Sequence, residues 1–368
     1  MAPQAPPRLG TLDRLLPVWI LLAMALGLAL AFVAPGFGDL LHAASIGTIS
    51  IPIAIGLLVM MYPVLAKVRY SDAAVVSRDK RLLVTSLILN WLVGPALMFA
   101  LAWLLLPDLP EYRTGLIIVG LARCIAMVLI WNDLACGDRE AAAFLVAINS
   151  VFQVIAFAGL GWFYLQVLPA WLGLPTTSAD FSVWAIMISV LVFLGIPLLA
   201  GYLSRVVGER TRGRDWYESV FLPRVSPLAL GGLLFTIVML FALQGQQVLA
   251  RPWDVARIAL PLLAYFVIMF LVGFVTGKLA RLSYERTTTL SFTAAGNNFE
   301  LAIAVAIGTF GAASGQALAG IVGPLIEVPV LVGLVYVALW LRPRFAAGTS
   351  GQSDGAAPAR QPVGTARR

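Results

Sequence analysis

Two short polar stretches interrupt apolar segments of this chain, and each ends in an ionisable side chain. The first reads Gly-Leu-Ala-Arg-Cys and ends at Cys124, and the second reads Gly-Asn-Asn-Phe-Glu and ends at Glu300. In both, a glycine stands four residues before the ionisable group, and the two glycines are 176 positions apart. A thiolate is a soft ligand for a metal or metalloid, and a buried carboxyl group can exchange a proton.

The composition indicates that these stretches lie in a membrane. Of the 368 residues, 60% are hydrophobic and 12% are charged, whereas a soluble domain averages about 45–50% apolar and about 25% charged. Apolar runs of roughly 20 residues recur along the chain, and each can cross about 30 Å of hydrocarbon as a helix. We therefore predict an all-α polytopic membrane protein. The net charge of +7 does not indicate a nucleic-acid partner, because the basic residues are concentrated in connecting loops.

The apolar runs predict ten transmembrane helices, and the segments outside them are predicted to be disordered tails, residues 1–13 and 346–368. The helices are expected at residues 15–33, 46–66, 82–106, 114–131, 141–168, 181–203, 225–243, 255–279, 287–310 and 316–341.

The basic residues predict the orientation of these helices. Of the 25 Lys and Arg residues, 21 fall on one side, only Arg113, Arg251 and Arg257 fall on the other, and Arg123 lies within a predicted helix. Cytoplasmic loops carry the excess of Lys and Arg. Both termini are therefore predicted to be cytoplasmic, in a multi-pass protein of the cell membrane.

The two halves of the chain resemble each other in the placement of Pro and Gly. Residues 52–56 parallel residues 227–231 at an offset of 175, close to the 176 that separates the two polar stretches. Near-equal offsets indicate a five-plus-five duplication, with repeats over residues 14–168 and 169–345. Because five is odd, the second repeat is inverted in the membrane. Inverted repeats with paired helix breaks are typical of secondary transporters, whose site lies near the midplane.

The two breaks are expected to meet, because unwound backbone at membrane depth is tolerated only inside protein or beside water. Ionisable groups at that depth are rare and usually functional. The candidate site combines the two breaks with one polar residue from each of two other helices. Its members are Arg123, Cys124, Asn149, Gly296, Asn297, Asn298, Glu300 and Glu327.

Several of these residues also have a structural interpretation. A cysteine is often only a small hydrophobe, and Glu300 could be a carboxylate that pairs with an arginine. Arg123 could activate the thiol, cap the carbonyls of the broken helix or pair with a carboxylate. Asn149 could line a cavity or hydrogen-bond a neighbouring helix. Cys136 is interpreted as structural or incidental, and no disulfide with Cys124 is expected across about 18 Å of helix.

No Walker motif, pair of metal-ligating histidines or nucleophile elbow occurs in the sequence. We therefore expect neither an enzyme nor a bound cofactor nor ATP hydrolysis. A membrane receptor is less favoured, since that function calls for a soluble sensing or output domain.

The same stretches resemble signatures of a known family. Residues 120–132 resemble the fourth-helix signature of the yeast-type arsenite efflux permeases, which belong to the bile acid/sodium symporter superfamily. Residues 296–307 resemble the ninth-helix signature of that family, and residues 324–330 resemble its tenth-helix segment. The resemblance extends over residues 14–345, which is all of the chain except its tails.

The resemblance implies a panel of helices 1, 2, 6 and 7 and a core of helices 3–5 and 8–10, with helices 4 and 9 broken and crossing. It implies export of arsenite, in some members antimonite, against inward proton flow. Carried to this sequence, Cys124 is the essential thiol and arsenic ligand, and Glu300 is the essential carboxyl that couples protons. The alternative is a sodium-coupled organic-anion symporter on the same scaffold. The coupling ion, the choice between arsenite and antimonite and the oligomeric state stay open.

Overall fold

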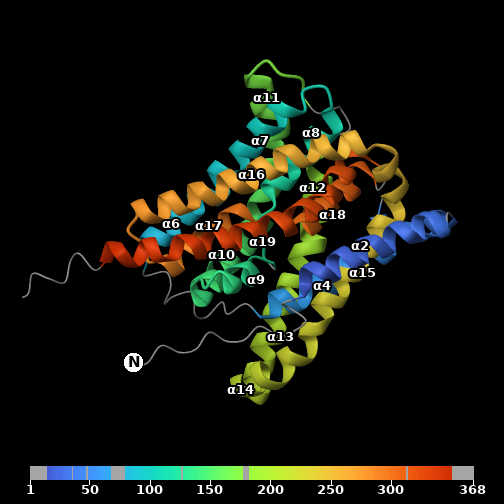
Figure 1. Cartoon of the computed structure of the whole chain (residues 1–368). Helices are drawn as coiled ribbons and strands as arrows, with labels where there is room; N and C mark the ends of the chain where they lie inside the picture. Colours follow the sequence, from blue (N-terminus) through green and yellow to red (C-terminus); the bar gives the residue numbers. More distant parts are fainter. Residues whose placement is uncertain are drawn as a thin grey trace, which may run out of the picture.

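The computed structural model of the protein describes residues 15–34, 36–46, 49–67, 79–125, 127–176, 182–311 and 314–349 (Figure 1). This part is helical apart from one short antiparallel ribbon, β1 (Ser45–Ile46) and β2 (Ile49–Ser50). Six of its helices are long and apolar enough to span a membrane, and three shorter helices are also apolar. These findings confirm an all-α polytopic membrane protein. The count of ten spans and the inverted repeat remain predictions.

The first half contains one helix break, and two turns of π-helix continue α6 into α7 and α10 into α11. Its elements are α2 (Leu16–Val33), α3 (Gly36–Ala43), α4 (Ile51–Ala66), α6 (Lys80–Ile88), η2 (Leu89–Val93), α7 (Gly94–Leu105), α8 (Pro110–Leu121), α9 (Met127–Leu134), α10 (Arg139–Trp162), η3 (Phe163–Val167) and α11 (Leu168–Trp171).

The second half contains a helix break between α17 and α18. Its elements are α12 (Val183–Val190), η4 (Leu191–Gly195), α13 (Ile196–Arg212), α14 (Arg214–Trp216), η5 (Tyr217–Phe221), α15 (Leu222–Ala250), α16 (Pro252–Leu279), α17 (Tyr284–Ala295), α18 (Phe299–Phe310) and α19 (Gly315–Thr349).

Each of the ten predicted segments contains a helix, but several predicted boundaries differ from the structure. The helix predicted over residues 46–66 begins only at Ile51, because the residues before it form the ribbon of β1 and β2. Two further boundaries differ because helices continue past them. The expected connection over residues 204–224 is mostly helical, because α13 continues to Arg212 and a new helical run starts at Arg214. Gly213 makes the turn between them with a φ of +87°, a conformation that glycine adopts without steric cost. At the other boundary, α19 continues through residues 346–349, which we assigned to the C-terminal tail. The rest of both tails lies outside the described residues.

Four helices, α2, α4, α13 and α15, form one group at the lower right of Figure 1. In this group α15 packs along both α2 and α4, and α13 packs along α4. Glycines allow the close contact between α4 and α15. A Cβ atom on Gly232 would lie 2.8 Å from the backbone nitrogen of Met60 and 3.0 Å from the carbonyl oxygen of Gly56. Small residues at such crossings let helix backbones approach in a membrane.

The buried side chain of Arg205 holds the end of α4 against α13. Its guanidinium donates to the carbonyls of Ala66 (3.2 Å) and Lys67 (3.1 Å) and pairs with Glu209 at 2.6 Å. The hydroxyl of Tyr217 donates to the same Ala66 carbonyl at 3.2 Å. Basic and polar side chains thereby satisfy carbonyls that a helix leaves without partners at its C-terminus.

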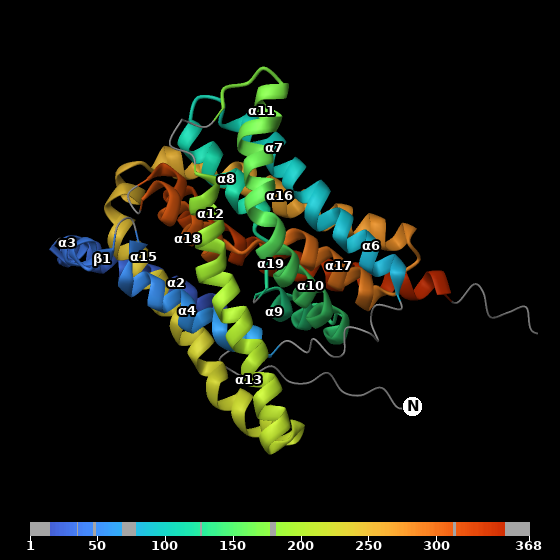
Figure 2. The ribbon, with the colours of Figure 1, turned by 180° about the vertical axis from the view of Figure 1, so that it is seen from behind.

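The second group contains α6 to α10 and α16 to α19, with both helix breaks among them. Within it, α16 packs on α17 and α19, α8 packs on α7 and α19, and α18 packs on α19. Buried aromatic rings fill the space beside the second break; those of Phe270 and Phe292 lie 5.2 Å apart at their centroids. Figure 2 shows the run from α12 to α13 passing from this group to the first one. At one end α12 contacts α10 and α18 of the second group, and at the other end α13 contacts α4 of the first group.

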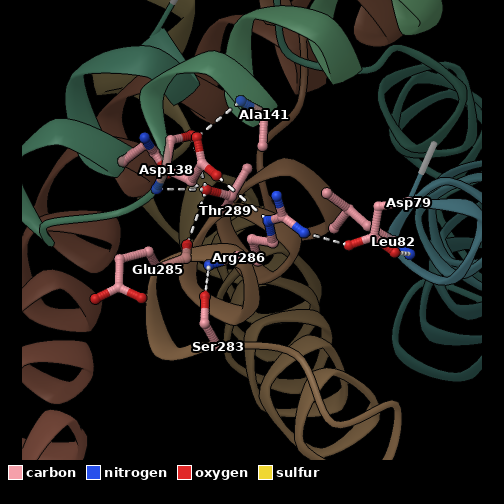
Figure 3. Close-up of polar contacts among 9 residues, drawn as sticks. Asp79, Leu82, Asp138, Ala141, Ser283, Glu285, Arg286 and Thr289 are labelled. Carbon is pink, nitrogen blue, oxygen red and sulfur yellow. Dashed lines mark hydrogen bonds and ion pairs between the residues drawn. The ribbon is translucent and has the colours of Figure 1, made fainter. Parts of the chain in front are cut away.

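Ion pairs fix the ends of three helices at one end of the second group (Figure 3). Arg286, in the first turn of α17, pairs with Asp79 at 2.6 Å and with Asp138 at 3.4 Å. Both aspartates also cap helix N-termini, since Asp79 accepts from the N–H of Leu82 and Asp138 from that of Ala141. One arginine therefore fixes the starts of α6, α10 and α17 relative to one another.

We expect Gly232→Ala to destabilise the packing of α15 on α4. The added Cβ meets backbone atoms of α4, which cannot rotate away as a side chain can, and overpacking costs about 1–3 kcal/mol. The matched control is Gly231→Ala, because nothing lies within 4 Å of a Cβ there and alanine is favoured over glycine in a helix by about 0.8–1 kcal/mol. Thermal unfolding in detergent should give a lower midpoint for Gly232→Ala only, and equal midpoints would contradict this contact.

Candidate functional site

Two unwound segments lie at the centre of the candidate site. In the first, α8 ends at Leu121 and α9 begins at Met127, and Ala122 has extended backbone angles of −86° and 113°. In the second, α17 ends at Ala295, and Gly296 turns out of the helix with a ψ of 142°. Glycine and asparagine are poor residues for a helix interior, which explains why Gly-Asn-Asn ends α17.

An antiparallel bridge between Arg123 and Asn297 joins the two breaks, although these residues are 174 positions apart in the chain. The N–H of Cys124 donates to the carbonyl of Gly296 at 3.3 Å, and the N–H of Asn298 donates to the carbonyl of Ala122 at 3.0 Å. Each break thereby supplies backbone partners that the other has lost from its helix. The breaks meet as the sequence predicted, and the pairing satisfies polar groups that would be costly if they were left unbonded in an apolar interior.

The side chain of Cys124 packs against Gly296 in the second break. Its side chain is 3% exposed, and a Cβ on Gly296 would lie 3.0 Å from the Cβ of Cys124 and 3.6 Å from its Sγ. A side chain at position 296 would therefore push the two breaks apart. Neither Cys124 nor Cys136 is in a disulfide, and within the described residues no cluster of His, Cys, Asp and Glu could hold a metal ion.

Arg123 is fully buried, and its guanidinium bonds to the framework of both breaks. One nitrogen donates to the carbonyl of Gly120, and another donates to the hydroxyl of Tyr265 at 2.7 Å. That hydroxyl donates in turn to the carbonyl of Ala294 at 3.4 Å, at the end of α17. The guanidinium lies close to α7, where a Cβ on Gly94 would come within 2.7 Å of it. Of the alternatives for Arg123, the structure shows the capping of broken-helix carbonyls.

The two amide side chains of α10 bond to different neighbours. The side-chain oxygen of Gln153 accepts from the backbone N–H of Arg123, so this residue is attached to the first break. The side-chain oxygen of Asn149 accepts from the indole N–H of Trp91 at 3.1 Å, which joins α10 to η2. Asn149 therefore has the helix-to-helix bond that we gave as one of its two alternatives.

Two carboxyl groups approach the second break from different helices. Glu300 stands in the first turn of α18 and is partly exposed, whereas Glu327, in α19, is 2% exposed. The backbone amide of Asn297 hydrogen-bonds to the carboxyl of Glu327, and the two carboxyls are close enough for their charges to interact. The structure therefore brings Glu327 to the same break as Glu300.

Several buried polar atoms beside this break have no hydrogen-bond partner among the described residues. The side-chain oxygen and nitrogen of Asn297, the side-chain nitrogen of Asn298 and one oxygen of Glu327 are all in this state. Asn298 uses its side-chain oxygen to cap α18 through the N–H of Leu301 at 3.0 Å. Buried polar groups are usually hydrogen-bonded, so this concentration of unpaired atoms is consistent with a place that binds a small polar solute or water.

Two residues of this arrangement were not identified from the sequence. Tyr265 is the one tyrosine of the apolar helix α16, and Gly94 is one of 33 glycines. Neither position carries a local signal, because its importance comes from contact with Arg123, which is far away in the chain.

Comparison with known proteins agrees with this architecture. The model of the Sodium Bile acid symporter family matches residues 54–251. The arsenical-resistance protein Acr3 of Corynebacterium glutamicum is 65% identical over 339 residues, which cover 92% of each chain. The protein of the same name from Alkaliphilus metalliredigens is 30% identical over 90% of this chain and 93% of its own. An uncharacterised transporter of Synechocystis sp. is 36% identical over 89% of this chain and 88% of its own.

The matched region, the extent of these similarities and the all-helical membrane architecture lead to one assignment. The chain belongs to the sodium bile acid symporter family of transporters, together with the Acr3 arsenical-resistance proteins.

Proposed function

We propose that this protein exports arsenite from the cell by proton antiport, with Cys124 as a labile ligand of the arsenic. The observation that carries the proposal is the bridge between the breaks. It places the buried thiol of Cys124 beside Asn297 and Asn298, whose side chains have polar atoms without a hydrogen-bond partner. The relatives named for arsenical resistance support the same substrate.

The chemistry of arsenite suits a single thiol. At neutral pH arsenite is mainly the uncharged trihydroxide, so charge alone does not hold it. The sulfur of Cys124 forms one As–S bond while one As–O bond breaks, and the thiol proton leaves with that hydroxyl as water. Soft thiolates favour such soft centres. A site with one cysteine releases its cargo more easily than a three-thiolate trap, and transport requires release. Antimonite has the same chemistry and is proposed as a second substrate.

The remaining polar groups of the breaks would orient the bound molecule. The unpaired side-chain atoms of Asn297 and Asn298 provide donors and an acceptor for its hydroxyl groups. The N-termini of α9 and α18 begin next to the breaks, and helix N-termini favour the oxygen atoms of a ligand. Gly296 allows the thiol to lie close to this segment. Arg123 and Asn149 act as positioning residues, since each bonds to a neighbouring helix.

Protons would couple to transport through the carboxyl pair. Two carboxyls in interaction hold a shared proton more readily than isolated ones, and Glu300 is the more exposed of the two. With Glu300 deprotonated, the inward-open state binds arsenite. Protonation from outside then favours release and return. A proton or ligand drives this cycle only if it binds the two states differently.

The two helix groups would supply the movement, as part of the same proposal. The first repeat, residues 14–168, and the inverted second repeat, residues 169–345, would each contribute two helices to the panel and three to the core. The panel corresponds to the group of α2, α4, α13 and α15. A shift of the core against this panel would open the breaks to each side in turn.

The substitution Cys124→Ser should abolish arsenite export, because a hydroxyl does not replace sulfur as a ligand for arsenic. Uptake of arsenite into everted membrane vesicles measures export directly. Cys136→Ser is the control, since it removes the other thiol at the far end of α9 and should transport as the wild type does. Near wild-type uptake by the Cys124→Ser protein at equal protein level would refute the ligand role.

The substitution Glu300→Gln should remove the response of transport to a proton gradient. In everted vesicles the lumen corresponds to the outside, so acidifying it should stimulate arsenite uptake by the wild type but not by this variant. Glu140→Gln, which removes an exposed carboxyl at the start of α10, should keep the stimulation. A Glu300→Gln protein that still responds to lumenal acid would exclude Glu300 from coupling. Sodium-dependent uptake of an organic anion, insensitive to thiol reagents, would favour the sodium-coupled symporter instead.

A further inference from the structure

We propose that a cleft between the start of α6 and the end of α16 binds the headgroup of an anionic phospholipid. This site is separate from the helix breaks, and it does not depend on the proposed substrate. It rests on the shape, charge and apolar surroundings of the cleft.

The cleft has a volume of about 490 Å³ and is formed by two helix ends that are almost 200 residues apart in the chain. Lys80 and Arg81 line it from the first turn of α6, and Arg281 lines it from the residues that follow α16. Arg281 has a left-handed backbone, with a φ of +58°, at the point where the chain leaves that helix. A volume of this size is within the range of small-molecule sites.

Among the residues that the structure describes, the positive charge of the cleft is not neutralised. Within the described part of the chain, no carboxylate forms an ion pair with Lys80, Arg81 or Arg281. The nearest acidic residue in the sequence, Asp79, is bonded elsewhere, because it pairs with Arg286 at 2.6 Å (Figure 3). Lys80 and Arg81 of α6 and Arg281 after α16 therefore line the cleft without a counterion among the described residues, and an anion would be attracted to it.

The apolar surface below the cleft distinguishes a lipid from a soluble anion. Val84 and Leu279 line the cleft together with the cations, and Leu279 is 78% exposed. One turn further along the same helices, Ile88 and Val275 are also exposed. Exposed apolar side chains at i and i+4 form a continuous stripe on each helix. Two such stripes, which lead from a basic cleft along α6 and α16, fit the acyl chains that hang from a phosphodiester headgroup.

The position of the cleft along the membrane normal also fits the headgroup of an anionic phospholipid. It lies at the end of the protein whose loops carry most of the Lys and Arg residues, which the sequence assigns to the cytoplasm. Anionic phospholipids give the cytoplasmic leaflet its negative surface potential, and basic pockets between transmembrane helices on that side bind their headgroups. We therefore assign the cleft to an anionic lipid of that leaflet.

The test is native mass spectrometry of the purified, delipidated protein, titrated with phosphatidylglycerol or with phosphatidylethanolamine of the same acyl chains. The wild type should bind phosphatidylglycerol more tightly than phosphatidylethanolamine. The combined variant Lys80→Gln, Arg81→Gln, Arg281→Gln should bind it roughly a hundredfold more weakly, since each cation near the surface contributes about a factor of five. Raising the salt concentration should weaken binding to the wild type.

A matched control removes the same charge from the same end of the protein. The combined variant Arg210→Gln, Arg212→Gln, Arg224→Gln changes three exposed arginines outside the cleft and should bind phosphatidylglycerol as the wild type does. Equal losses in both triple variants would overturn the site, because general surface charge would then explain the binding. Unchanged binding by the Lys80, Arg81, Arg281 variant would overturn it as well.

Two further variants separate a lipid from a free anion and from a folding defect. Val84→Ser with Leu279→Ser keeps the cations but removes the apolar lining, and it should also weaken phosphatidylglycerol binding. Full displacement of the lipid by millimolar inorganic phosphate, with no effect of this double variant, would assign the cleft to a soluble anion and overturn the proposal. The charge-conserving variant Lys80→Arg, Arg81→Lys, Arg281→Lys should retain binding, and loss of binding there would contradict recognition by charge.

Discussion

The backbone pairing between the two unwound segments is the constraint on which the rest of this structure depends. A broken helix exposes N–H and C=O groups, and the hydrocarbon of a membrane provides no partner for them. Here the N–H of Cys124 and the carbonyl of Ala122 bond to the other break, so neither interruption is stable without its counterpart. The crossing thus fixes the position of α8, α9, α17 and α18 in one step, and it brings together side chains that are far apart in the chain.

A buried arginine reinforces this crossing from one side. Arg123 bonds to its own break, to Tyr265 and, through that hydroxyl, to the end of α17. An unpaired charge in an apolar interior is costly unless hydrogen bonds surround it, so these bonds stabilise one arrangement of the two breaks. Cys124, the side-chain amides of Asn297 and Asn298, and the carboxyls of Glu300 and Glu327 take no part in these arginine bonds. The arginine that holds the two breaks together is therefore distinct from the other candidate residues.

The remainder of the protein holds this centre through contacts of two kinds. Close glycine contacts join α4 to α15 in the first helix group, and small residues are the usual means of helix association where lipid supplies no hydrophobic driving force. Ion pairs at the helix ends, such as that between Arg286 and Asp79, fix the second group where water can reach them. Because the run from α12 to α13 passes between the groups, a displacement of one group would be transmitted to the other through this helix.

The sequence alone determined the class of the protein and the places where its helices break, because apolar runs need a membrane and Gly-Asn-Asn does not continue a helix. It also gave Cys124 and Glu300 as candidate site residues, since ionisable groups are conspicuous in apolar surroundings. The tertiary structure decided the partners. Only the fold shows that Glu327 reaches the second break, that Tyr265 receives Arg123, and that Gly232 rather than the adjacent Gly231 contacts α4. These facts depend on distances between segments far apart in the chain, and no local pattern of residues encodes them.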